Sequence, residues 1–271
     1  MKSASYPFLS LAYAADKLCN ASFGMPVRSG KDVKIFVFQH FEAPLPDCFS
    51  NRDLYVPVNA GAAVHGPVEG AIGDDSAPSI SHLNRFLNEM TAIFWIGRHY
   101  EEVGSPEYVG FAHYRRCLEW SEKLLGKGVA FASVFATRST NRKFFVDCHG
   151  SRWLDLFMER FCGTFGDGYD DVNRFWELHS MYLANNFITD RETFFRYFDF
   201  AEKCLAICEG LIENNRSELD AMSPVAKRQF SYVMERMTGY WLWRENRAGR
   251  IKIVRSKLRC YDMDNNMTRV R

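Results

Sequence analysis

The sequence predicts an α/β domain with a mostly parallel central sheet flanked by helices and with a helical C-terminal half. Two apolar segments, residues 33–38 and 108–112, are expected to be buried strands. Between them, residues 83–97 carry apolar side chains at spacings of three and four, which predicts an amphipathic helix. Strand, helix and strand in this order are typical of parallel sheets. With 271 residues, the chain is long enough for one large domain with a complete core.

Gly, Pro and Ser residues divide the first part of the chain. Residues 1–31 mix small residues, Gly and Pro, and are expected to form an extension outside the core. Residues 41–78 contain several Pro and Gly and are expected to be loops around a short strand at residues 54–58. Ser79 or Ser81 is expected to cap the helix that precedes the second strand.

The second half of the chain is predicted to be mostly helical, after an ambiguous segment at residues 118–150. Helices are expected over residues 153–161, 172–183 and 191–214 and from Pro224 on, and strands over residues 185–188 and 250–255. Asp190 fits the N-cap of the third helix, and Pro224 fits the first turn of the last. We expect the domain to span residues 32–256, followed by a basic tail at residues 257–271.

Composition excludes several classes of protein. A net charge of +1 argues against nucleic-acid binding. No apolar run is long enough to span a membrane, and the 8 Cys include no CxxC pair, so we expect reduced thiols in the cytoplasm. Basic residues predominate from Arg250 on, and two interpretations of them stay open: peripheral contact with anionic lipid at the inner face of the membrane, or a solvated tail.

The strand at residues 108–112 ends in the sequence His113-Tyr114-Arg115-Arg116. Ligands of open α/β sheets bind just beyond the carboxyl ends of strands. Guanidinium groups hold phosphate through paired hydrogen bonds and stay charged at any biological pH. This segment therefore predicts an anion site, against the alternative that both Arg are solvated or paired with nearby acids.

A second constellation lies on the last long helix. Arg228 and Glu235 are seven residues apart, which places them two turns apart on one face, away from the apolar stripe. A carboxylate near an Arg stays ionised and can accept a proton from a substrate hydroxyl. The alternative is an ordinary solvated face. No metal-binding motif appears, apart from Asp262-Met263-Asp264 in the predicted tail, so we assign no metal ligands.

Six segments, in order, resemble the bacterial glycosyltransferases of the capsular-polysaccharide-synthesis class, a family long described as a domain of unknown function. They are the strand at residues 34–38 with His40, residues 55–62, Gly73-Asp74-Asp75 with the Ser79-Ile80-Ser81, Asn84, Glu89, Thr91 and Trp95 pattern, residues 108–116, residues 185–188, and Arg228 with Glu235-Arg236. Two departures, Ser76-Ala77-Pro78 and Met90, fall on the donor-side loop and the helix after it.

The resemblance implies a GT-A-like fold. It also implies transfer of a sugar, galactofuranose or another hexose, from a nucleotide diphosphate donor to a glycan or lipid-linked glycan acceptor of a surface polysaccharide. The implied donor-binding residues are His40, Asp75, Glu89, His113, Arg115 and Arg116. Asn185 and Arg228 are implied to hold sugar or acceptor, with Glu235 as the first candidate base and Asp190 as the second.

In GT-A-like folds, an Asp-x-Asp that binds a metal usually follows the fourth strand, where this chain has cations instead. Two alternatives therefore stay open: cationic side chains replace the metal at the diphosphate, or Mn²⁺ or Mg²⁺ is held elsewhere, by carboxylates such as Asp74 or Asp75. We expect partial or full activity without a metal. Two rival functions also stay open. One is a non-catalytic glycan- or nucleotide-binding protein on the same fold, and the other is a nucleotide-sugar hydrolase, in which water replaces the acceptor.

Overall fold

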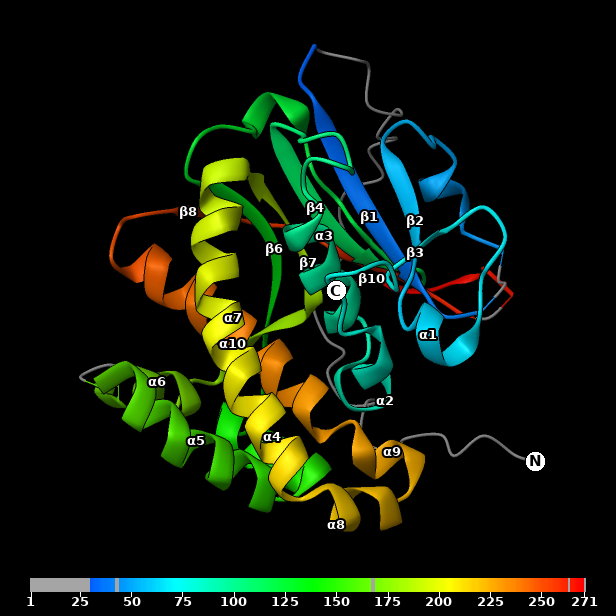
Figure 1. Ribbon diagram of the computed structural model, residues 1–271. Helices are drawn as coiled ribbons and strands as arrows, with labels where there is room; N and C mark the ends of the chain where they lie inside the picture. The colour runs from blue at the N-terminus through cyan, green and yellow to red at the C-terminus, as the bar shows by residue number, and fades with distance from the viewer. Residues whose placement is uncertain (1–29, 42–43, 167–168, 263, 271) are drawn as a thin grey trace.

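The computed structural model describes residues 30–41, 44–166, 169–262 and 264–270, and it confirms the α/β class (Figure 1). Almost all of the predicted N-terminal extension, residues 1–29, lies outside the described residues. Within those ranges, a seven-stranded sheet forms the centre of the molecule. Its strands, in spatial order, are β3 (Ile72–Gly73), β2 (Tyr55–Asn59), β1 (Val33–Gln39), β4 (Tyr108–His113), β7 (Ser180–Asp190), β6 (Val129–Ala136) and β8 (Lys252–Arg255).

The sheet is mostly parallel, as predicted. Strands β3, β2, β1 and β4 run parallel to one another, and so do β6 and β8. Strand β7 runs antiparallel to both of its neighbours, β4 and β6. In register, Phe38 of β1 pairs with His113 of β4, and Gln39 pairs with Asn59 of β2. The three parallel strands therefore end at the same edge of the sheet, where a ligand of an open α/β fold is expected.

Alternation of side chains along the strands produces two apolar layers. Phe36 of β1 faces a core made with helices α3 (Met90–Arg98), α7 (Arg191–Asn214) and α10 (Gln229–Arg247), which cover one face of the sheet (Figure 1). Ile35 and Val37 face the opposite layer. That layer includes a three-stranded antiparallel sheet of β5 (Arg116–Leu118), β9 (Leu258–Tyr261) and β10 (Met267–Val270).

The remaining helices are short or lie around the long ones. They are α1 (Ala62–His65), α2 (Asn84–Leu87), α4 (Asn141–His149), α5 (Arg152–Phe165), α6 (Tyr169–Trp176), α8 (Arg216–Ala221) and α9 (Pro224–Lys227). The helical C-terminal half is therefore confirmed. Asp190 caps α7, since its side chain accepts a hydrogen bond from the N–H of Thr193, and Pro224 occupies the first turn of α9.

Local predictions failed where distant parts of the chain pair. The predicted helix at residues 172–183 is wrong in its second half, because α6 ends at Trp176 and residues 180–183 belong to β7. Met181 there pairs with Phe135 of β6, and β6 lies in the segment that local pattern left ambiguous. Residues past 257 form β9 and β10, for which the sequence predicts no secondary structure.

Candidate functional site

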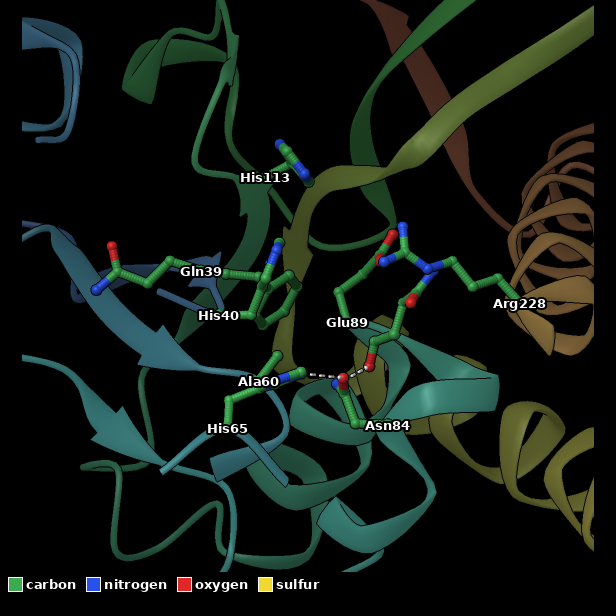
Figure 2. Close-up of a pocket in the computed structure, with 10 residues that line it drawn as sticks. Gln39, His40, Ala60, His65, Asn84, Glu89, His113 and Arg228 are labelled. Atoms are coloured by element: carbon green, nitrogen blue, oxygen red, sulfur yellow. Dashed lines mark hydrogen bonds between the residues drawn. The ribbon is translucent and has the colours of Figure 1, made fainter. Parts of the chain in front are cut away.

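A pocket opens at the edge where the parallel strands end (Figure 2). Its space between atoms is about 510 Å³, a value that includes the open solvent at its mouth. Its lining residues come from the ends of β1, β2 and β4, from α1, from the α2–α3 region and from the start of α10: Phe38, Gln39, His40, Ala60, His65, Asn84, Asn88, Glu89, His113 and Arg228. Figure 2 shows His40 and His113 on one side of this space and Arg228 on the other.

Two of the lining His residues are held in the neutral form. Burial lowers the pKa of His40 to about 4, with further contributions from His65, Arg228 and Arg115. Burial also lowers the pKa of His113 well below its usual value, and the charges of Arg116 and Arg115 add to this effect. The His113 Nδ1 atom accepts a hydrogen bond from the backbone N–H of Arg115 at 3.2 Å, so its Nε2 atom carries the proton.

Both predicted phosphate ligands lie close to the pocket. Arg115 affects the pKa of His40 and His113, and Arg116 affects the pKa of His113 and Glu89. Side chains of neighbouring strand residues usually point to opposite faces, but the chain turns between β4 and β5. This turn lets both guanidinium groups act on the same site.

Glu89 lines the pocket, and the charge of a second carboxylate, Glu235, acts on it. Burial raises the pKa of Glu89, and the nearby charge of Glu235 raises it further, while Arg116 and Asn185 oppose the shift. Asn185 donates from Nδ2 to Glu89 Oε1 at 3.3 Å. Glu235 also forms an ion pair with Arg236, whose Nη1 lies 3.5 Å from Glu235 Oε2. A carboxylate with a raised pKa beside a second carboxylate is typical of acid–base sites.

Two Asn residues next to Glu89 adopt left-handed backbone conformations. Asn88 has φ 47° and ψ −133°, and Asn185 has φ 49°. Such values are uncommon for residues other than Gly and cluster at functional sites. Asn88 directly precedes Glu89, and its conformation ends α2 and divides the single predicted helix into two. Asn185 is buried, and its Oδ1 atom has no hydrogen-bond partner among the described residues.

Asp74 anchors the loops behind the pocket. Its buried carboxylate accepts hydrogen bonds from the N–H groups of Gly61 and Ala62 and from the hydroxyls of Ser81 and Thr91. All five residues belong to segments that resemble the glycosyltransferase family. A large part of that resemblance is therefore explained by one hydrogen-bonded core that holds α1, α2 and α3 at the strand ends.

The structure separates the ten predicted site residues into three groups. His40, Glu89, His113 and Arg228 line the pocket, and Arg115, Arg116, Asn185 and Glu235 interact with its lining residues. Two predictions are not supported by position. Asp75 is exposed and does not line the pocket. Asp190 pairs with Tyr108, at the opposite end of β4 from His113, and its two oxygens accept the N–H groups of Thr193 and Gly128.

Six lining residues received no role from the sequence, and three of these, His65, Asn84 and Asn88, are joined by hydrogen bonds. Asn84 Oδ1 and His65 Nε2 are 3.0 Å apart, and Asn84 Nδ2 donates to the carbonyl of Asn88 at 2.8 Å (Figure 2). The only signal for them was the place of Asn84 in a family-like segment. Arg228 lies just before α10 rather than on it, so the predicted shared helical face with Glu235 is only approximate.

The described residues contain no group of three or more His, Cys, Asp or Glu side chains placed to hold a metal ion. In the same part of the chain, no helix is long and apolar enough to cross a membrane. Two of the C-terminal basic residues are ion-paired, Arg250 with Glu245 and Arg259 with Glu119.

Comparisons with known proteins agree with this description. A search of curated proteins gave no match. Among solved structures, the chain is similar to one described as the apo structure of the WbbM bifunctional glycosyltransferase, with a TM-score of 0.67 and 20% sequence identity. The similarity covers 84% of this chain and 45% of that one, so the chain spans less than half the length of its structural relative. At this identity the likeness shows a shared fold. Residues 34–246 match the family described as a domain of unknown function, DUF4422, and the chain therefore belongs to that family.

Proposed function

We propose that the protein is a glycosyltransferase that moves a sugar from a nucleotide diphosphate donor to a glycan or lipid-linked glycan acceptor. One observation supports this most: Glu89, His113 and Arg228 line one pocket at the carboxyl ends of parallel strands, and the charges of Arg115, Arg116 and Glu235 act on these lining residues. The resemblance to capsular-polysaccharide enzymes favours a hexose, such as galactofuranose, and a reaction at the cytoplasmic face of the membrane.

In the proposed reaction, the bond between the anomeric carbon and the diphosphate oxygen breaks, and the diphosphate leaves with the electron pair. Arg115 and Arg116 stabilise the negative charge that develops there, and His113 donates a hydrogen bond from Nε2. Arg228 is exposed at the pocket and makes no side-chain hydrogen bond or ion pair within the described part of the chain, so it is available to a ligand.

A new bond then forms between the anomeric carbon and an acceptor hydroxyl oxygen, whose proton passes to a carboxylate. The sequence favours Glu235 as this base, and the geometry favours Glu89. Glu89 lines the pocket, and its raised pKa brings it closer to neutral pH, where general bases work best. Glu235 supplies part of that shift. The buried Oδ1 of Asn185, beside Glu89, accepts a substrate hydroxyl in this proposal.

A donor screen tests this proposal. Each nucleotide sugar is incubated with and without an acceptor mixture, and the released nucleotide diphosphate is measured. We expect release that depends on acceptor. Release without acceptor at the same rate would identify a hydrolase, and binding without release would identify a non-catalytic binding protein.

Two variants then assign the base. Glu89→Gln keeps the size of the side chain and should lower kcat by about 10²–10⁴-fold with little change in donor affinity. Glu235→Gln should lower kcat less and should shift the acidic limb of the pH–rate profile to lower pH, because it removes a charge that raises the pKa of Glu89. The opposite pattern would make Glu235 the base.

A further inference from the structure

We infer that Asn88 and Ser231 are positioning residues that set the separation of Glu89 and Glu235 through one hydrogen bond between their side chains. This inference rests on the proposed function for its catalytic consequence. The Asn88–Ser231 hydrogen bond, and the place of the two carboxylates on two different segments of the chain, do not depend on that function.

The bond joins the two segments that supply the carboxylates. Asn88 Nδ2 donates to Ser231 Oγ at 3.1 Å. Asn88 directly precedes Glu89 in the chain. Ser231 is buried on α10, and Glu235 lies four residues further on, so the two share one face of the helix. The bond is therefore one residue from the first carboxylate and one helical turn from the second.

The backbone conformation of Asn88 is unfavourable for any residue other than Gly, so its side chain is expected to have a role that offsets the strain. With φ 47° and ψ −133°, this position suits Gly, and any other residue there is strained. Gly would remove the strain but could not donate to Ser231. The strained peptide is held in place, because its carbonyl accepts from Asn84 Nδ2 at 2.8 Å. Asn84 in turn bonds His65 at the pocket wall.

The carboxylates of Glu89 and Glu235 repel each other, so contacts between their two segments must hold them close. Glu89 is flanked by Glu235 from α10, by Arg116 from β5 and by Asn185 from β7, and His113 and Arg228 line the same pocket. Among these groups, Glu235 is the one whose charge raises the pKa of Glu89. Loss of the Asn88–Ser231 bond should let α10 relax away from Glu89. The pKa of Glu89 should then fall, while burial, the largest cause of the shift, still holds it above its ordinary value.

The experiment compares the full chain with Ser231→Ala and Asn88→Gly. The pKa of Glu89 is measured by NMR titration with carboxyl-labelled Glu, assigned through Glu89→Gln. Thr238→Ala is the matched control, because Thr238 is also a buried hydroxyl on α10 but bonds Tyr197 on α7. We expect a lower Glu89 pKa in both test variants and an unchanged one in the control. Asn88→Gly relieves strain, so it serves if Ser231→Ala does not fold.

Turnover tests the proposed function, and the Glu89 pKa tests the role of the Asn88–Ser231 hydrogen bond. Turnover should fall by about 10-fold in the test variants, because misplacement of about 1 Å costs up to about 100-fold in rate. In a Glu235→Gln background, Ser231→Ala should no longer move the Glu89 pKa. An unchanged Glu89 pKa in Ser231→Ala, or a shift that persists without Glu235, would overturn the inference. A wild-type protein that turns over no nucleotide sugar would refute the proposed function, while the NMR result would still decide this one.

Discussion

Replacing Asp74 by Asn distinguishes a structural anchor from a metal ligand. Asp74 is fully buried, and its oxygens accept hydrogen bonds from four groups: the N–H of Gly61, the N–H of Ala62 and the hydroxyls of Ser81 and Thr91. Asn keeps the shape, removes the charge and replaces one acceptor oxygen by a donor. The perturbation is therefore confined to this hydrogen-bonded core.

The expected loss of stability depends on which hydrogen bonds each carboxylate oxygen of Asp74 accepts. Oδ1 accepts from Gly61, Ala62 and Ser81, and Oδ2 accepts from Thr91 and shares the Gly61 N–H. With its own oxygen in the Oδ1 position, Asn keeps three bonds but loses their charge, at about 1 kcal/mol each. The Thr91 hydroxyl can turn to donate to the Asn88 carbonyl, 3.0 Å away, and accept from the new NH₂ group. The total is about 3 kcal/mol.

For a chain of this size, about 3 kcal/mol corresponds to a fall in Tm of roughly 6–12 °C. Circular dichroism at 222 nm measures the transition, with and without EDTA. Asp75→Asn is the matched control, because Asp75 is adjacent and exposed, and it should change the free energy of unfolding by no more than about 0.5 kcal/mol. A wild-type Tm for Asp74→Asn, together with lost metal-stimulated turnover, would refute the structural role and make Asp74 a ligand.

Other outcomes follow from the pocket itself. A bound diphosphate should raise the pKa of His40 from about 4, so calorimetric affinity for a nucleotide sugar should increase from pH 7 to pH 5, and His40→Gln should remove this trend. Arg228→Ala should weaken acceptor binding by about 10-fold at constant Tm and leave nucleotide diphosphate affinity unchanged. Exposed Arg138, which does not line the pocket, is its control, and equal effects would contradict a specific contact. Turnover should survive EDTA, and full loss restored by Mn²⁺ would contradict metal-free catalysis. Because the folded pKa of Glu89 is raised, its ionisation costs stability above about pH 4.5, so Glu89→Gln should raise Tm at pH 8 and not at pH 4.

The sequence was sufficient for the elements whose pattern is local. The strand at residues 33–38 and the strand that ends at His113 are buried on both faces, so they are continuous apolar runs and are easily recognised. Strand β7 was recognised only at residues 185–188. Its first residues pair with Phe135 and neighbours on β6, and local pattern carries no information about such a partner.

The site residues also differ in whether local sequence pattern or long-range packing determines their position. His40 and His113 were predictable because each follows a parallel strand, and such strands end at one edge. Asp190 and Glu89 were not distinguishable, because both are acids next to helix starts. Asp190 lies one strand length from His113, about 16 Å along β4, and only the antiparallel direction of β7 places it there. The partnership of Glu89 with Glu235 depends on how α10 packs on α2, which no local pattern encodes.

The cations and the carboxylates of the proposed site come from different elements of the fold. The end of β4 and the turn after it supply His113, Arg115 and Arg116, whereas α10 and the segment before α3 supply Glu235 and Glu89. A leaving diphosphate gains negative charge as an acceptor hydroxyl loses a proton. A site with cations at one wall and a base at the other stabilises both changes at once. The donor diphosphate then belongs beside β4 and the acceptor beside α10. Acceptor affinity should therefore respond to substitutions on α10 that leave nucleotide affinity unchanged.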